Sequence, residues 1–250
     1  MMRETVLYGL LAALANILGG LWITSPGNKV SRTPLTYLLA LGAGFLLAAV
    51  FLKVIPASLR LPRWHEQMEI PLLLVLGGYL LIQFFEHTVA PHFHFGEETH
   101  GEAVLATPAM VAAVGGLAMH TFFDGVAIAS STTVDPRLGL IVFIAIVLHK
   151  IPEGFTVASI VLASGRSPQV ARSATTVVAL ATLAGVAAVA AARESVVYAL
   201  PLSAGVTLYV ATSDLIPEIN KAERGFMSLV VFGGVALYYA TEKVLERVGL

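Results

Sequence analysis

The sequence predicts an all-α polytopic membrane protein with eight transmembrane helices, and three observations support this fold class. Hydrophobic residues make up 57% of the 250 residues and charged residues only 12%, about half the charged share of a soluble domain. Long apolar segments recur along the whole chain, separated by breaks rich in proline, glycine and charge. The first three segments also resemble the last three, and we expect a single transmembrane domain over residues 1–250.

Each predicted span holds about 20 mostly apolar residues, the length that crosses the hydrocarbon core of a bilayer. The spans are placed at residues 5–23, 35–55, 71–90, 108–131, 138–163, 172–192, 197–217 and 226–245. Most connections are short, so consecutive spans are expected to be antiparallel neighbours in one compact bundle.

The first span, 5–23, could instead be the apolar core of a signal peptide, because it follows Arg3. It is long for such a core, and no convincing small-residue cleavage pattern precedes Pro26. We therefore expect this segment to be retained as a span.

Self-comparison of the chain pairs spans two with seven, three with eight and, more weakly, one with six. The aligned segments are 41–56 with 202–217, 77–87 with 233–243, and 13–15 with 179–181. Because the members of a pair are five spans apart, they cross the membrane in opposite directions. The sequence thus predicts an inverted repeat of spans 1–3 and 6–8 around central spans 4 and 5, where such repeats usually hold a substrate site.

The two central spans each carry a histidine four residues before an acid, His120 with Asp124 and His149 with Glu153. On a helix this spacing puts both side chains on one face, one turn apart. Two imidazoles and two carboxylates suit zinc, and also cadmium, iron, manganese or cobalt. A single such residue could simply hydrogen-bond a neighbouring helix. Two pairs on consecutive spans favour a metal site, since each ionisable group at bilayer depth costs roughly 2.5–3.5 kcal/mol.

Residues beside the two acids predict how the helices pack. Pro152 lacks an N–H and crowds the carbonyl of Leu148, so the fifth helix is expected to loosen next to the site. Gly125 and Gly154 directly follow the acids and would let another helix approach closely.

The stretches His120-Thr-Phe-Phe-Asp124-Gly-Val-Ala-Ile and His149-Lys-Ile-Pro-Glu153-Gly-Phe resemble the paired fourth and fifth helices of the ZIP (Zrt/Irt-like) family of divalent metal transporters. The eight-helix layout of that family covers nearly all of this chain. The resemblance implies zinc or a similar ion as cargo rather than as a cofactor, uptake toward the cytoplasm, and frequent homodimers. It also implies a plasma or inner membrane location with both termini extracytoplasmic, and a cytoplasmic position for residues 91–107.

The chain departs from the family pattern after each histidine. Many members carry Asn after the first and a metal-binding Asn, Asp or Glu after the second, which supports a second adjacent ion; here these positions are Thr121 and Lys150. A protonated ammonium cannot ligate a cation, and beside the carboxylates it could stand in for the charge of the second metal. We therefore expect a single-ion site. The alternative is that Lys150 turns away or snorkels.

Five further polar residues lie in apolar spans and are candidates for an ion path: Lys53, Glu86, His87, Asp214 and Glu242. They could relay ions or merely fasten helices together. Lys53 and Asp214 occupy equivalent positions of the repeat, so they are expected toward opposite membrane faces.

The segment 91–107 carries His92, His94 and His100 among acids. It resembles the His-rich loop common in the family, and could capture metal transiently; the alternative is a plain solvated loop.

The function predicted from these features is transport of divalent metal ions by alternating access. The main alternative is an intramembrane zinc hydrolase, which needs an open coordination position and a general base. The chain has no His-Glu-x-x-His motif, and all four groups are spent as ligands. A channel or metal sensor would differ mainly in its kinetics.

The net charge of −1 and the absence of a basic run exclude a nucleic-acid surface, and the absence of cysteine excludes thiolate metal sites.

Overall fold

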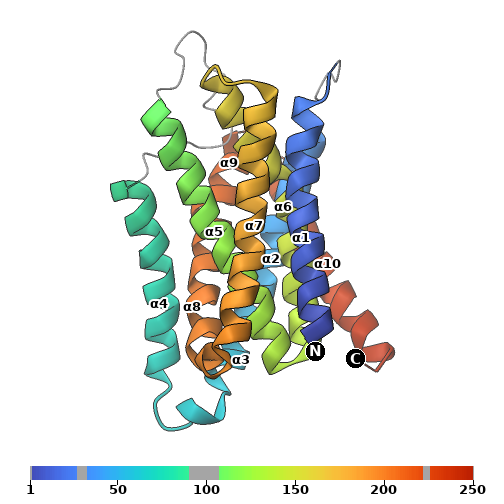
Figure 1. Ribbon diagram of the computed structural model, residues 1–250. Helices are drawn as coiled ribbons and strands as arrows, with labels where there is room; N and C mark the ends of the chain where they lie inside the picture. Colours follow the sequence, from blue (N-terminus) through green and yellow to red (C-terminus); the bar gives the residue numbers. More distant parts are fainter. Residues whose placement is uncertain (1, 27–32, 90–106, 222–225, 250) are drawn as a thin grey trace.

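The computed structural model describes residues 2–26, 33–89, 107–221 and 226–249, and these contain eight helices long and apolar enough to cross a membrane (Figure 1). They are Met2–Thr24, Thr33–Leu59, Glu69–Thr88, Thr107–Val134, Pro136–Ala163, Pro168–Ala191, Arg193–Lys221 and Met227–Arg247. The described part of the chain contains no strand. The predicted all-α fold of eight spans is therefore confirmed. His92, His94 and His100 lie outside the described residues.

Five of the spans are single α-helices: α1 (Met2–Thr24), α5 (Thr107–Val134), α6 (Pro136–Ala163), α7 (Pro168–Ala191) and α10 (Met227–Arg247). The other three are composite. Span two joins α2 (Thr33–Ala49), η1 (Val50–Val54) and α3 (Ile55–Leu59); span three joins α4 (Glu69–Phe84) and η3 (Phe85–Val89). Span seven joins η5 (Arg193–Ser195), α8 (Val196–Tyr209), η6 (Val210–Leu215) and α9 (Ile216–Lys221). A short turn, η2 (Pro62–Trp64), connects span two to span three.

Proline shapes spans two and seven but does not loosen span five. The π-helical turns η1 and η6 end just before Pro56 and Pro217, where a wider turn accommodates a ring that would crowd the preceding carbonyl. By contrast, α6 runs as continuous α-helix through Pro152, so the expected local unwinding is not observed. Close packing of α1 on both sides of this proline, at Ile151 and Gly154, holds the helix in shape.

Short, well-capped turns join the central helices. Between α5 and α6 only Asp135 intervenes, and its carboxylate accepts a hydrogen bond of 2.8 Å from the backbone N–H of Leu138, a regular N-cap. Between α6 and α7 the chain turns at Gly165, whose φ of 74° favours glycine. These turns hold α5, α6 and α7 as antiparallel neighbours.

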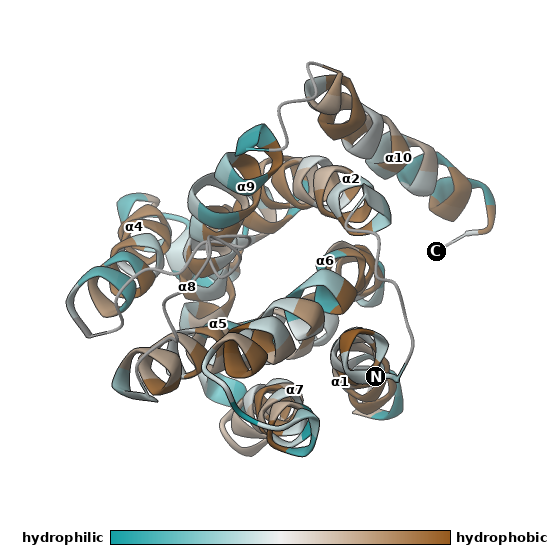
Figure 2. Ribbon diagram, turned by 90° about the horizontal axis from the view of Figure 1, so that it is seen from above, coloured by the Kyte–Doolittle hydropathy of each residue, from teal (hydrophilic) through white to brown (hydrophobic). Residues whose placement is uncertain are grey.

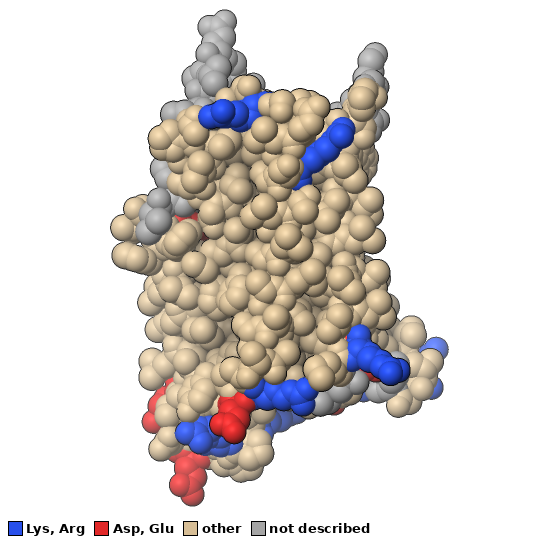
Figure 3. All heavy atoms as spheres, in the orientation of Figure 1, with Lys and Arg blue, Asp and Glu red and all other residues tan. Residues whose placement is uncertain are grey.

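The helices form two groups that meet along the middle of the bundle (Figure 2). In one group α1, α5, α6 and α7 pack on one another; in the other α4 packs on α8 and α10 packs on α2, and contacts of α2 with α6 and of α5 with α8 join the groups. Both termini lie at the same end of the bundle (Figure 1). On the face drawn in Figure 3, charged side chains gather toward the two ends and leave a broad uncharged band between them, as a bilayer requires.

Four helix pairs approach one another through reciprocal glycines, one from each helix. The pairs are Gly19 with Gly154 for α1 and α6, Gly125 with Gly185 for α5 and α7, Gly78 with Gly205 for α4 and α8, and Gly44 with Gly234 for α2 and α10. A Cβ atom at any of these glycines would stand 1.8–2.2 Å from a carbonyl oxygen of the partner helix. Small residues allow such backbone approach in membranes, and the close approach expected at Gly125 and Gly154 is confirmed.

The glycine contacts also follow the pattern that an inverted repeat would produce. Gly44 and Gly205 occupy aligned positions of the predicted repeat, and so do Gly78 and Gly234. The contact of α2 with α10 is therefore the counterpart of the contact of α8 with α4. The repeat itself stays a prediction.

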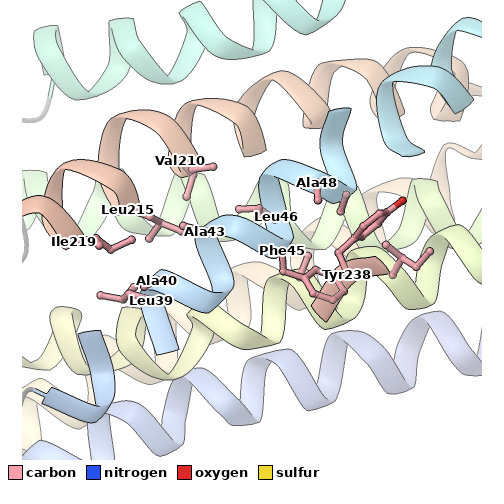
Figure 4. Packing of buried hydrophobic residues seen from close by; sticks show 14 of the residues in the cluster. Leu39, Ala40, Ala43, Phe45, Leu46, Ala48, Val210, Leu215, Ile219 and Tyr238 are labelled. Atoms are coloured by element: carbon pink, nitrogen blue, oxygen red, sulfur yellow. The ribbon is translucent and has the colours of Figure 1, made fainter. Parts of the chain in front are cut away.

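An apolar cluster fills the space where α2, η6, α9 and α10 meet (Figure 4). Phe45 on α2 and Tyr238 on α10 are both buried, and their rings meet edge to face with centroids 5.7 Å apart, a favourable aromatic geometry. Leu46, Leu215 and Ile219 pack into the same cluster.

Replacing Gly78 by Ala should destabilise the protein, because the new Cβ atom would stand 2.0 Å from the carbonyl oxygen of Leu202. We expect a loss of about 2–3 kcal/mol, the upper range for overpacking, seen as a lower melting temperature in detergent. The adjacent Gly77→Ala is the matched control, since nothing lies within 4 Å of its new Cβ atom. Equal melting temperatures for the two variants would contradict this packing.

Candidate metal site

The four residues that the sequence predicts as ligands come together between α5 and α6. His120 and Asp124 project from α5, and His149 and Glu153 from α6; one ligand atom of each lies within 4.8 Å of all the others. None of the four side chains is appreciably exposed, the largest residue exposure being 7% at Glu153. The four predicted ligands therefore lie together in the interior of the bundle.

The separations within this cluster suit a small divalent cation. The Nε2 atom of His120 lies 3.3 Å from Oδ2 of Asp124 and 3.8 Å from Oε2 of Glu153. The Nε2 atom of His149 lies 3.5 Å and 4.0 Å from the same two oxygens. Zinc bonds of about 2.0–2.2 Å set the corners of a tetrahedron about 3.3–3.6 Å apart, so small side-chain movements would complete such a shell.

Both imidazoles present a free nitrogen to the cluster. The Nε2 atoms of His120 and His149 are buried and have no hydrogen-bond partner among the described residues. On the other side of its ring, Nδ1 of His149 lies 3.2 Å from the carbonyl oxygen of Ala145. That contact selects the tautomer protonated at Nδ1 and leaves the lone pair of Nε2 for a metal ion, a common arrangement of metal-binding histidine.

Lys150 points into the cluster rather than away from it. Its side chain is 0% exposed, and Nζ lies 2.7 Å from Oδ2 of Asp124 and 2.6 Å from Oε2 of Glu153. The second contact is a hydrogen bond; the first is off hydrogen-bond geometry and acts through charge. Nζ also donates to Oγ1 of Thr121 at 3.3 Å. The snorkelling alternative is therefore wrong for this lysine.

The other carboxylate oxygen of Glu153 is held by two neutral donors. Oε1 accepts a short hydrogen bond from the hydroxyl of Thr121 and one of 2.8 Å from Nδ2 of Asn16. Asn16 comes from α1 and was not predicted from the sequence, where span one was expected only to be a retained span and the repeat partner of span six. The available signal was a single amide in the middle of an otherwise apolar segment, three residues before Gly19.

Two of the predicted path residues, Lys53 and Glu242, bind each other in a separate cluster. Nζ of Lys53 lies 2.8 Å from Oε2 of Glu242. Nη2 of Arg137, in the first turn of α6, lies 2.6 Å from Oε1 of the same carboxylate, and the hydroxyl of Tyr238 donates to Oε2 at 3.1 Å. The contacts tie span two, α6 and α10 together, which matches the helix-fastening alternative for this pair.

The remaining path residues lie near η3 and η6. Glu86 is in η3 and Asp214 is in η6, and both side chains are half-buried. His87 is exposed, and its Nδ1 atom lies 2.9 Å from the carbonyl oxygen of Gln83. Among the described residues Lys53 pairs with Glu242 and not with Asp214.

The chain matches known proteins over the region that holds this cluster. A family model described as ZIP zinc transporter matches residues 98–242. Zinc transporter ZIP9 of Micropogonias undulatus is 31% identical over 170 residues, which is 62% of this chain and 54% of that protein. Zinc transporter SLC39A7 of Mus musculus is 30% identical over 133 residues, 47% of this chain and 28% of that protein.

A second ZIP9 sequence, from Xenopus tropicalis, is 30% identical over 168 residues and covers the same shares of the two chains, 62% and 54%. This chain spans about half the length of the relatives named ZIP9 that it matches. The family match covers more than half of the chain and includes both central helices. The resemblance inferred from the two His-x-x-x-acid stretches is confirmed, and the chain belongs to the ZIP zinc transporter family.

Proposed function

We propose that this protein carries zinc across a membrane by alternating access through one site, formed by His120, Asp124, His149 and Glu153. The observation that supports this most directly is the buried cluster itself, with four ligand atoms within 4.8 Å of one another at the centre of a membrane bundle. Such groups are costly in an apolar setting and mark ion pathways. The same donor set accommodates cadmium, iron, manganese or cobalt as alternative cargo.

The family and the topology support an orientation with both termini outside the cytoplasm. Both termini lie at one end of the bundle (Figure 1), and η3 ends and α5 begins at the other. Under this orientation Glu86 and Asp214 lie between the cluster and the cytoplasm, and they line the inward path. The residues 91–107, with His92, His94 and His100, then follow on the cytoplasmic side.

The hydrolase alternative is not favoured by any feature of the cluster. A hydrolase needs a general base beside the metal-bound water. In the proposed site both carboxylates of the cluster are metal ligands, so neither is left for that role.

The position of Lys150 supports a single transported ion. Its ammonium lies between Asp124 and Glu153 and contacts one oxygen of each. A second cation bridging these carboxylates would have to occupy the same space and would meet the positive charge of the ammonium. Thr121 adds only a hydroxyl, which is already used to bind Glu153.

Transport should depend on the ligands that α6 supplies to the cluster. In proteoliposomes that contain a zinc-sensitive dye, wild-type protein should give saturable zinc flux, and His149→Ala or Glu153→Ala should lower the rate by about 100-fold or more, beyond the usual effect of losing an outer-shell partner. His65→Ala and Glu66→Ala are the matched controls, because both residues are exposed on the connection between spans two and three. Unchanged flux in the cluster variants would refute the site.

The site between α5 and α6 should bind one ion. In titrations of purified protein with Cd²⁺, the double variant His120→Ala/His149→Ala should bind one ion fewer than wild type, because it loses the only intramembrane ion. Lys150→Asp should bind one ion more than wild type, since it replaces the ammonium by a third carboxylate. Two ions lost together in the double variant would contradict the single-ion site.

Lys150→Met should destabilise the protein when no metal is present, because Asp124 and Glu153 then face each other without a counter-charge. Removing one partner of a buried charge group costs about 3–5 kcal/mol, which should appear as a lower melting temperature in the presence of a chelator. Added Zn²⁺ should restore much of the loss by supplying the missing charge. Lys243→Met is the control, since it breaks only the surface pair with Glu246; similar melting of the two variants in chelator would argue against this role of Lys150.

A further inference from the structure

The first helix, α1, contacts the metal cluster through the polar side chain of Asn16. It is 0% exposed, and Nδ2 lies 2.8 Å from Oε1 of Glu153. An ionised carboxylate can only accept hydrogen bonds, so the amide nitrogen and not the amide oxygen must face it. The orientation of this amide is therefore fixed by chemistry.

The contacts of Asn16 are those of a residue that serves Glu153. Its Oδ1 atom is buried and has no hydrogen-bond partner among the described residues. An amide that only fastened two helices would normally use its donor and its acceptor, because a buried acceptor without a partner is unfavourable. Here the whole hydrogen bonding of the side chain is directed at one carboxylate oxygen.

The backbone around Asn16 is built to bring it to Glu153. A Cβ atom at Gly154 would stand 1.8 Å from the backbone oxygen of Asn16 and 3.0 Å from its Oδ1 atom, and a Cβ atom at Gly19 would stand 1.9 Å from the carbonyl oxygen of Ile151. Only glycine at both positions allows α1 to lie this close to the turn that carries Glu153. The glycine after the acid therefore makes room for the asparagine.

At the equivalent place of the predicted repeat, on α7, the side chain makes no such contact among the described residues. Residues 13–15 align with 179–181, so Thr182 corresponds to Asn16, and the Cβ atom of an alanine at Gly125 would stand 2.0 Å from its backbone oxygen. Thr182 is 0% exposed, but its hydroxyl has no partner among the described residues. The approach of α1 to α6 and that of α7 to α5 are thus similar, but among the described residues it is α1 that hydrogen-bonds a carboxylate of the cluster.

We propose that Asn16 is a positioning residue for the transported ion: together with Thr121 it holds Oε1 of Glu153, so that Oε2 faces the two histidines and Lys150. This role rests on the proposed function, since it concerns the same ion site. It makes the first helix part of the site, although α1 provides no ligand to the metal.

The test uses Co²⁺ as a probe, because its visible absorption reports the arrangement of its ligands. Purified full-length wild type, Asn16→Leu and Thr182→Val are titrated with Co²⁺, and their flux is measured in proteoliposomes. We expect Asn16→Leu to weaken Co²⁺ binding about 10–100-fold, as for the loss of an outer-shell partner, and to change the absorption bands. Thr182→Val should match wild type in both, and Thr121→Val should change the bands in the same direction as Asn16→Leu.

Wild-type affinity and absorption bands in folded Asn16→Leu would overturn the proposal, and so would a lower melting temperature with unchanged bands, which indicates a purely structural role. If Asn16→Leu does not fold, Asn16→Ala, which adds no bulk between α1 and α6, is judged by the same two readouts. Wild-type protein that binds Co²⁺ but does not transport would overturn the proposed function alone. If wild type transports normally and the Asn16 variants keep its Co²⁺ affinity and absorption bands, the positioning role alone would be overturned.

Discussion

The interaction on which the centre of this structure depends is the contact of one buried ammonium with two buried carboxylates. Asp124 and Glu153 bring two negative charges into an apolar bundle, where an uncompensated charge is very unfavourable. Nζ of Lys150 lies within 2.7 Å of an oxygen from each, so α5 and α6 can remain packed when no metal ion is bound. Without this lysine the cluster would need a cation, or protons, merely to stay folded.

Helix packing turns that charge cluster into a site of defined geometry. The glycines that follow the two acids let α1 and α7 approach at the turns where the acids sit, so each carboxylate is backed by a neighbouring helix. Contacts with α2 and α8 cover the other sides of α6 and α5. The ligands are therefore held by helix backbones rather than by loops, which limits their movement.

The parts of this structure that could be predicted are those encoded by local spacing. Apolar length determines the spans, and an interval of four residues puts His120 beside Asp124 and His149 beside Glu153. The direction of Lys150 could not be settled from sequence, because it depends on whether the charge of the facing helix is close enough to attract it. Asn16 was missed for a similar reason: its importance arises only because Gly19 and Gly154 bring two distant segments into contact. At Pro152 the local rule gave the wrong answer, since tight packing against α1 outweighed the tendency of proline to unwind a helix.

Lys150 also determines how much charge a moving site would carry across the membrane. The ammonium and the two carboxylates together contribute one net negative charge to the empty cluster, and a bound divalent ion changes this contribution to one net positive charge. In an importing carrier the loaded site moves inward and the empty site returns outward, so a voltage that is negative inside favours both movements. Each unit charge that crosses 100 mV gains about 2.3 kcal/mol. A fixed lysine in place of a second metal ion would thus allow the membrane potential to drive both halves of the cycle.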